Sequence, residues 1–242
     1  MIKHIEIENK KGRILRDYLN KPSKAKSIVV FLHGYTGNKT EHNGHFREFS
    51  RLLAKENIAS LRMDYSCNGE SDGNFRDFLF TDALLDAKLM IDFAFKVKGI
   101  EEVSLLGFSM GGLIASLLCN YKPFKQILLW SPSDNLYEKV KRQYELLPKL
   151  ENGNGYQNGF EISKGLVASM KEIDAFKEVK HFNKPVLVIH GRNDKAVDYK
   201  VGEKYAKTYP KGKLIIIESA NHGYDRFSEV KELFSSSLVF LK

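Results

Sequence analysis

The stretch 107–111 reads Gly-Phe-Ser-Met-Gly, which is a Gly-x-Ser-x-Gly pattern centred on Ser109. An apolar, strand-like run (103–106) precedes it, and a helix-like run (113–118) follows it. Glycines two positions before and after the serine let the chain turn sharply from strand to helix without a Cβ clash. Such a turn strains the serine backbone and lifts its hydroxyl off the sheet, at the positive end of a helix. The pattern therefore predicts a nucleophile on a strand–turn–helix unit.

Strand-like and helix-like runs alternate along most of the chain. Apolar patterns predict strands over 2–7, 14–19, 27–32, 58–63, 103–106, 126–130, 185–190 and 213–217. Helical spacing predicts helices over 46–55, 81–96 (with Thr81 as a cap), 109–120, 201–208 and 227–241. The first two strands form a hairpin, and helical crossovers join the others. We therefore expect an α/β fold with a mostly parallel sheet and helices on both faces.

Residues 134–180 break this alternation, because the segment is longer than one crossover helix requires. It contains two helical pieces around a loop rich in Gly and Asn at 151–159. We expect a core domain made of residues 1–133 and 181–242, with 134–180 as a lid or cap insertion over the carboxyl edge of the sheet. Aromatic side chains of the insertion either line an apolar pocket or form its own small core, and the sequence leaves both open: Tyr144, Tyr156 and Phe160.

Composition and charge indicate the compartment of the protein and the kinds of partner that it has. The 242 residues carry a formal net charge of +8, but the basic residues are interleaved with 30 acidic ones, so we expect a solvated basic surface and no nucleic-acid partner. No apolar run approaches the roughly 18–20 residues of a membrane-spanning helix, and the N-terminus has no signal-peptide pattern. Cys67 and Cys119 show neither metal-ligand nor disulfide spacing, which favours a reducing cytoplasm and no metal. The sequence is compatible with both a monomer and a homodimer.

A serine hydroxyl attacks a carbonyl poorly unless a base removes its proton, and the base needs a pKa near neutrality, which points to histidine. Of seven histidines, His222 best fits this role. It follows the last predicted strand and precedes the last helix, so its loop lies at the same sheet edge as Ser109. The other candidates weighed for the base lie in a strand, a helix start or the insertion: His4, His42, His45 and His181.

The base needs a carboxylate that fixes its tautomer and stabilises the imidazolium. Asp194 follows the strand that ends at His190, and it gives the chain order Ser, Asp, His that suits this architecture. Asp134 and Asp198 are alternatives, although Asp198 has the pattern of a helix N-cap.

The oxyanion formed by attack needs backbone N–H groups aimed at it. One donor is the amide of Met110, directly after the nucleophile. The second is expected from the loop His-Gly-Tyr-Thr-Gly at 33–37, where Gly34 allows close approach and the Tyr35 amide donates.

Taken together, these motifs resemble the α/β-hydrolase superfamily, in particular the small bacterial serine esterases of the cinnamoyl or feruloyl esterase type and the monoacylglycerol-lipase-like hydrolases. The resemblance lies in residues 33–39, 62–65, 69–73, 107–112, 190–194 and 221–222. It implies an α/β-hydrolase fold, Ser109 as nucleophile, Asp194 as acid, His222 as base, and Tyr35 and Met110 as oxyanion donors, with no cofactor. At 66–68 the chain has Ser-Cys-Asn where many relatives carry glycine and histidine, so contacts of that loop are not carried over.

The predicted activity is hydrolysis of a small-molecule carboxylic ester through an acyl-serine, with an aryl-acrylate or a short-to-medium acyl ester as substrate. Monoacylglycerol, thioester or peptide hydrolysis is the alternative within the same chemistry. Outside it, the alternatives are a non-catalytic binding module that keeps the fold and a lyase that uses the same serine and histidine for proton transfer. The intact set of nucleophile, base and acid disfavours a pure binding module, which has no need of all three.

Overall fold

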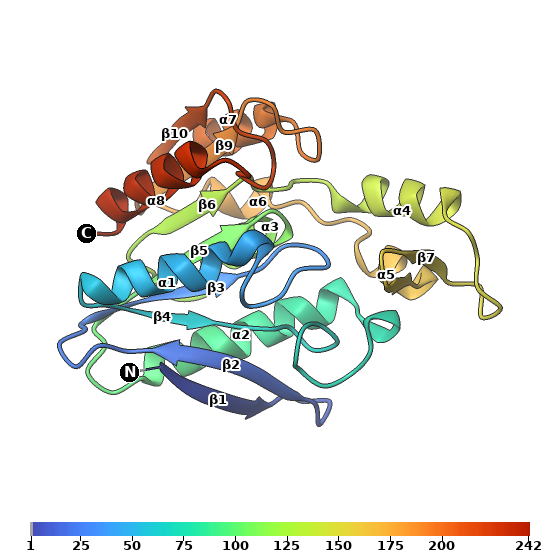
Figure 1. The fold of residues 1–242 in the computed structure, drawn as a ribbon, viewed down its shortest axis with the longest axis horizontal. Coiled ribbons are helices and arrows are strands. Elements are labelled where there is room, and N and C mark those ends of the chain that lie inside the picture. The colour runs from blue at the N-terminus through green and yellow to red at the C-terminus, as the bar shows by residue number, and fades with distance from the viewer. Residues whose placement is uncertain (1) are drawn as a thin grey trace.

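A computed structural model describes residues 2–242, which form one central eight-stranded sheet and a separate small hairpin (Figure 1). Along the sheet the order is β1-β2-β4-β3-β5-β6-β9-β10. These strands are β1 (Ile2–Glu8), β2 (Ile14–Asn20), β3 (Ser27–Leu32), β4 (Ile58–Arg62), β5 (Glu102–Phe108), β6 (Ile127–Trp130), β9 (Val186–Gly191) and β10 (Gly212–Ile217). The β1–β2 and β2–β4 pairs are antiparallel, and every other neighbouring pair in the sheet is parallel. The predicted α/β fold is therefore confirmed.

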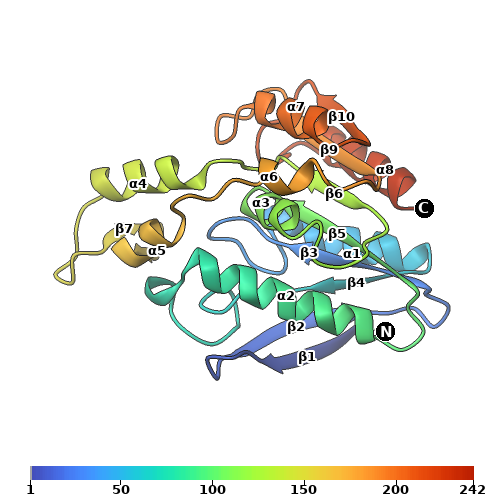
Figure 2. The same cartoon turned by 180° about the vertical axis from the view of Figure 1, so that it is seen from behind.

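Helices cover both faces of the sheet. Figure 1 looks onto the face that carries α1 (His45–Lys55) and α8 (Phe227–Leu241), and Figure 2 looks onto the face that carries α2 (Phe80–Lys96), α3 (Met110–Leu117) and α7 (Tyr199–Thr208). Side chains alternate between the two faces along each strand. In β3, Val30 joins the core under α2 and α3, whereas Phe31 joins the core under α1 and α8. This double burial explains why the run 27–32 is apolar without interruption.

The segment 134–180 leaves the sheet between β6 and β9. It contains α4 (Leu136–Leu146), β7 (Gly155–Gln157), β8 (Phe160–Ile162), α5 (Lys164–Ser169) and α6 (Phe176–Val179). In Figure 1, α4, β7 and α5 project to the right of the sheet. The expected loop at 151–159 is wrong in part, because β7 and β8 pair there as an antiparallel hairpin. Its two-residue turn is Asn158-Gly159, both with positive φ, and this dipeptide is typical of such hairpins.

The start of α2 differs from the prediction. The helix begins at Phe80 with Leu79 as N-cap, so Thr81 does not cap it. The Phe80 amide donates to the Ser169 hydroxyl at 2.9 Å, which supplies the first turn with an acceptor from α5. A contact between residues far apart in sequence thus replaces a local cap.

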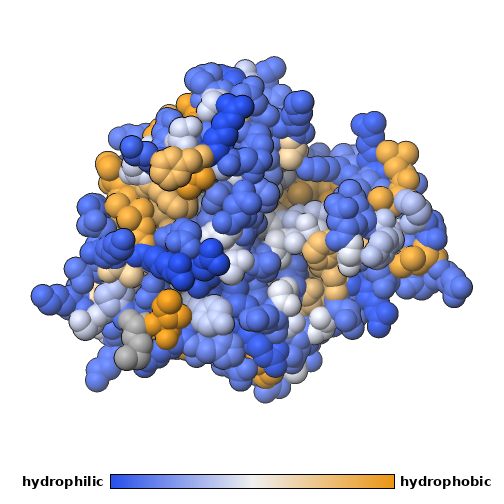
Figure 3. Space-filling model, in the orientation of Figure 1, coloured by the Kyte–Doolittle hydropathy of each residue, from blue (hydrophilic) through white to orange (hydrophobic). Residues whose placement is uncertain are grey.

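The surface is largely hydrophilic, and Figure 3 shows separate apolar patches, among them one over the right-hand end where α4 to α5 lie. Within 134–180 the exposed large apolar side chains are Leu146, Leu150 and Tyr156. Among residues 2–242, no helix has the length and hydrophobicity to span a membrane.

Candidate active site

Ser109 occupies a strained turn between β5 and α3. Its φ of 52° and ψ of −115° lie where residues with a Cβ are rarely found. The turn is held from both sides: the Ser109 amide donates to the Trp130 carbonyl at 3.0 Å, and its own carbonyl accepts from the Gly112 amide at 3.0 Å. The sequence pattern thus produces the predicted strand–turn–helix unit, with the hydroxyl at the start of α3.

The glycines of the pattern are required by contact. A Cβ at Gly107 would lie 2.7 Å from the Gly112 Cα. A Cβ at Gly111 would overlap the Leu32 carbonyl and lie 2.8 Å from the His33 carbonyl oxygen. Because Gly111 lacks this atom, the first turn of α3 packs directly on the end of β3. The loop after β3 therefore lies beside the serine.

The structure brings Ser109, His222 and Asp194 into one hydrogen-bonded chain. The Ser109 hydroxyl lies 3.0 Å from His222 Nε2, and His222 Nδ1 lies 2.6 Å from Asp194 Oδ2. Because a carboxylate only accepts, His222 carries its proton on Nδ1 and leaves Nε2 free to accept from the serine. The Phe108 ring packs against the His222 imidazole at a centroid distance of 5.0 Å. This geometry lets the imidazole accept the serine proton while the carboxylate holds the ring in place.

Asp194 is buried, and its carboxylate is fully bonded. Its Oδ1 accepts from the Ala196 and Val197 amides at 2.8 Å each, while Oδ2 accepts from His222 and from His190 Nε2, the latter at 3.1 Å. Burial by itself would raise the pKa of Asp194, but the hydrogen bonds from His190 and His222 hold it well below its ordinary value. The carboxylate therefore stays ionised beside the base.

The other acids considered for this role lie elsewhere. Asp134 faces the Lys204 amine at 3.8 Å, and Asp198 caps α7 by accepting from the Lys200 amide at 2.9 Å, as its sequence context predicts. Neither has a hydrogen bond to His222 among the interactions of residues 2–242.

The other histidines of this edge also have separate partners. His42 Nε2 lies 2.7 Å from Asp225 Oδ1, and His45 Nε2 lies 2.8 Å from the Gly223 carbonyl oxygen. Both rings thus contact the loop that follows His222. They support that loop, and His222 is the histidine that bonds to the Ser109 hydroxyl.

The amides expected to form an oxyanion hole are available. The Met110 amide is in the first turn of α3, where helix amides have no partner inside the helix. Within the part of the chain that the structure describes, the Tyr35 amide has no acceptor. Gly34 brings the loop close to the serine, since a Cβ there would lie 3.4 Å from the Ser109 Cβ. Two donors can therefore face a carbonyl carried by the serine.

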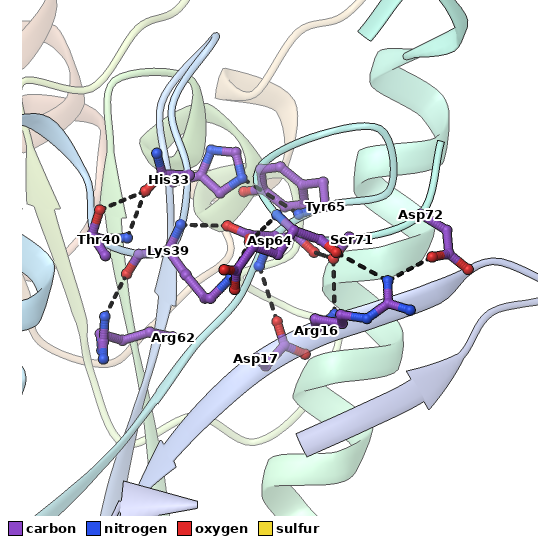
Figure 4. Close-up of polar contacts among 12 residues, drawn as sticks. Arg16, Asp17, His33, Lys39, Thr40, Arg62, Asp64, Tyr65, Ser71 and Asp72 are labelled. Atoms are coloured by element: carbon purple, nitrogen blue, oxygen red, sulfur yellow. Dashed lines mark hydrogen bonds and ion pairs between the residues drawn. The ribbon is translucent and has the colours of Figure 1, made fainter. Parts of the chain in front are cut away.

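A buried polar network holds this loop in place (Figure 4). The Asp64 carboxylate accepts from the Lys39 amide at 2.5 Å, forms an ion pair with the Lys39 amine, and accepts from the Glu70 amide at 2.9 Å. The backbone carbonyl of Asp64 accepts from the Ser71 hydroxyl at 2.9 Å. Glu70 and Ser71 lie in the loop that follows β4, and Lys39 lies in the loop that follows β3. Asp64 thus joins two loops at the carboxyl edge of the sheet.

His33 begins the same loop and is fully buried. Its Nδ1 donates to the Gly34 carbonyl at 2.8 Å, and its Nε2 lies 3.4 Å from the Tyr65 amide. Burial lowers the pKa of His33 to about 4, so the ring is neutral at physiological pH. A neutral ring can serve as donor on one side and acceptor on the other, which the loop requires.

Glu41 closes the loop from the other end, and sequence reasoning missed it. Its Oε2 accepts from the Gly34 amide at 2.7 Å, and its Oε1 accepts from the His42 amide at 3.1 Å. Glu41 has a φ of 57°, and burial raises the pKa of its carboxyl group to about 7. Glu41 thus occupies the Gly34 amide, whereas the next amide, that of Tyr35, has no acceptor within residues 2–242. No local pattern announces this contact, because it depends on the shape of the loop.

A pocket of about 450 Å³ opens at Ser109. Its walls come from the loop after β3, the turn at Ser109 between β5 and α3 (the elbow) and the loop that carries His222: residues 34–38, Glu41, His42, Phe108, Ser109, His222, Gly223 and Asp225. Among residues 2–242, no group of three or more His, Cys, Asp or Glu side chains is arranged to hold a metal ion.

Residues 134–180 contact both sides of this site. On one side, the Lys139 amine of α4 donates to the Ala196 carbonyl, in the loop that carries Asp194, at 3.0 Å. On the other, the Phe160 ring packs on Phe75 at 4.7 Å, and Phe75 packs on Tyr35 at 5.8 Å between ring centroids. Phe160 therefore packs on residues outside the segment 134–180.

The two tyrosines of the insertion behave differently from Phe160. The Tyr144 hydroxyl donates to the Gly153 carbonyl inside the insertion at 2.9 Å, and Tyr156 is exposed. No common apolar cluster of the three rings forms.

A serine on a sharp turn between a parallel strand and a helix, in a sheet of this order with helices on both faces, defines an α/β-hydrolase. Residues 23–153, more than half of the chain, match the family described as serine aminopeptidase, S33. The chain belongs to this family.

Similar proteins include esterases and lipases. The putative esterase/lipase 2 of Mycoplasma genitalium is 26% identical and aligns over 91% of each chain. The structure of Est1E from Butyrivibrio proteoclasticus with bound ferulic acid superimposes with a TM-score of 0.86 at 26% identity, over 98% of this chain and 97% of that one. A lysophosphatidylserine lipase of Macaca fascicularis is 25% identical over 81% of this chain, which spans 49% of that protein. The chain is a carboxylic ester hydrolase of the esterase/lipase type.

Proposed function

We propose that the protein hydrolyses carboxylic esters through an acyl-serine intermediate on Ser109, with His222 as base and Asp194 as the orienting acid. The observation that carries the proposal is the unbroken hydrogen-bonded chain from the Ser109 hydroxyl through the His222 imidazole to Asp194, with distances of 3.0 and 2.6 Å. The first distance allows proton transfer from the serine to the ring without rearrangement, and the second holds the ring in the tautomer that accepts this proton.

The reaction has two halves. His222 Nε2 takes the hydroxyl proton as the Ser109 oxygen attacks the ester carbonyl, and the amides of Tyr35 and Met110 bind the resulting oxyanion. The imidazolium then protonates the departing alcohol, which leaves the acyl-serine. Water, deprotonated by the same ring, attacks the acyl carbon and releases the acid. Asp194 stabilises the imidazolium in both halves.

We propose an aromatic acrylate ester, or a short-to-medium acyl ester, as the substrate. Two observations support an aromatic acyl group. The similar Est1E binds ferulic acid. The loop that offers the Tyr35 amide is backed by aromatic rings, since Tyr35 packs on Phe75, and Phe75 packs on Phe78 and Phe160.

We also propose that 134–180 acts as a cap on the core domain 1–133 and 181–242. The contacts of Lys139 and Phe160 on the two sides of the pocket support this role. A cap in this position would form a wall for the acyl group.

A fluorophosphonate probe tests the chemistry directly, because it labels only a serine that a base has activated. We expect one labelled residue, Ser109, in the wild type and none in Ser109→Ala. Turnover of p-nitrophenyl acetate should fall by several orders of magnitude in that variant, since the three residues act as a unit. Ser236→Ala, on α8 and away from the pocket, is the matched control and should retain full turnover. Unchanged turnover in Ser109→Ala would end the acyl-serine proposal.

The substrate class is tested separately by a panel of methyl ferulate, p-nitrophenyl esters of graded chain length, monoacylglycerols and aminoacyl amides. We expect the highest kcat/KM for methyl ferulate or the shorter acyl esters. A clear preference for long-chain monoacylglycerol would replace this substrate with a lipid and leave the chemistry intact.

A further inference from the structure

A second histidine contacts the carboxylate that orients His222. His190 lies near the end of β9 and is fully buried. Its Nε2 lies 3.1 Å from Asp194 Oδ2 and 3.0 Å from the Val197 carbonyl oxygen. The same Asp194 oxygen accepts from His222 Nδ1 at 2.6 Å. One carboxylate oxygen therefore joins two imidazole rings.

The surroundings of His190 determine where its proton lies. Both neighbours of Nε2 are acceptors, so Nε2 carries the hydrogen. Nδ1 is buried and, within residues 2–242, has no hydrogen-bond partner. It faces Gly202 of α7, where a Cβ would lie 2.6 Å away. A proton on Nδ1 would be a buried charge without an acceptor, which is costly. The ring is thus held as a neutral donor between β9 and α7.

We propose that His190 is a positioning residue of the reaction, which donates from Nε2 to Asp194 Oδ2 and so moderates the hold of that carboxylate on His222. The inference rests on the proposed roles of Ser109, His222 and Asp194. A carboxylate oxygen that already accepts one hydrogen bond attracts a neighbouring imidazolium less strongly. His190 therefore favours the unprotonated His222 that accepts from the serine. It also fixes the direction in which Asp194 Oδ2 faces His222.

Other charged or titratable groups surround this pair, but they act from a greater distance. The Lys139 amine of α4 donates to the Ala196 carbonyl, and the buried Tyr224 hydroxyl donates to the Ile189 carbonyl. Asp225, beside His222 in the pocket wall, is bonded to His42 and Asn221. Among the described residues, His190 is the one group that shares the Asp194 oxygen with His222.

The test is the pH dependence of kcat/KM for p-nitrophenyl acetate in full-length variants. His190→Leu removes the donor at similar volume. His190→Gln restores an N–H at the same number of bonds from Cβ. In His190→Leu, we expect the ascending limb of the profile of kcat/KM against pH to move to higher pH. The expected shift is about one pH unit, which is the effect of removing one hydrogen bond from a carboxylate. His190→Gln should return it toward wild type, and KM should not change, because His190 does not line the pocket.

Ser237→Ala is the matched control, since it removes a buried hydrogen bond to the Trp130 indole, 2.9 Å long, that does not touch the triad. It should lose stability without moving the limb. The inference would be overturned if the ascending limb of His190→Leu stayed at its wild-type pH while urea denaturation showed that the variant is folded. An equal shift in Ser237→Ala would also overturn it, because the effect would then be one of general stability.

Nitrogen NMR of the labelled wild-type protein provides a second test that needs no folded variant. We expect the His190 ring to carry its hydrogen on Nε2 and none on Nδ1. A ring with its proton on Nδ1 would refute the donor role. Turnover that survives in Ser109→Ala would refute the proposed triad itself. If Ser109→Ala is inactive but the ascending limb of His190→Leu is unmoved, only the role of His190 is refuted.

Discussion

Replacing Gly111 with alanine should damage both stability and catalysis, because this glycine sets the distance between the elbow and the loop after β3. The added Cβ would overlap the Leu32 carbonyl and lie 2.8 Å from the His33 carbonyl oxygen. Both obstacles are buried backbone, so neither can rotate away as a side chain could. Either α3 or the end of β3 must move. Overpacking of this kind lowers the free energy of unfolding by about 1–3 kcal/mol.

The same displacement would separate the amides of Met110 and Tyr35, which lie on the two segments that Gly111 brings together. A misplacement of about 1 Å in a catalytic group costs on the order of 10²-fold in rate. We therefore expect kcat/KM for p-nitrophenyl acetate to fall by about that factor in Gly111→Ala, and urea denaturation to show the stability loss.

Gly165→Ala in α5 is the matched control for this prediction. A Cβ there would meet its nearest atom, Leu79 Cδ2, at an ordinary 3.5 Å. It should leave kcat/KM unchanged and stabilise the protein by about 0.5–1 kcal/mol, because alanine favours a helix over glycine. A Gly111→Ala protein with wild-type unfolding and wild-type kcat/KM would refute the packing argument.

Three further predictions concern the buried groups around the site. Asp64→Asn should lower the free energy of unfolding by about 1–3 kcal/mol, because it removes the buried charge that faces the Lys39 amine and leaves the more exposed Glu70 carboxylate, 2.8 Å away, as the charged partner of that amine; a loss too small to resolve by urea denaturation would contradict this. The pKa of Glu41 is raised from 4.5 to about 7, so its contribution to stability is present below pH 4.5 and is lost as the pH rises through 7. Glu41→Gln should remove that part of the stability–pH curve, and an identical curve would disprove the assignment. The pKa of His33 is lowered from 6.5 to about 4, so stability falls as the pH drops from 6.5 to 4, and proton NMR should show this ring neutral at pH 5.

Much of the architecture was predictable from the sequence because its signals are local. The continuous apolar run 27–32 indicates a strand covered on both faces, and the structure places it near the centre of a mostly parallel sheet. Gly-x-Ser-x-Gly predicts the turn at Ser109, because only glycines fit beside the neighbouring backbone. Asn158-Gly159 carried an equally local hairpin signal that the prediction of a loop overlooked.

Other features were outside the reach of any local pattern. The N-cap of α2 is Leu79 and not the predicted Thr81, because the Phe80 amide is satisfied by Ser169 of α5, 89 positions away. Glu41 binds the Gly34 amide only because the loop between them closes into a compact turn. Side-chain hydrogen bonds of this kind depend on distances that exist only after the chain has folded.

The chain alone therefore determined the sheet, the elbow and the three side chains nominated for the reaction, since periodicity, glycine placement and chain order report on backbone geometry and on which loops share an edge. Tertiary structure decided how those side chains are supported. It placed His190 and His222 on one oxygen of Asp194, and Lys39 against Asp64. The reason is physical: backbone preferences act over a few residues, whereas the burial and pairing of charge depend on segments that meet only in the folded protein.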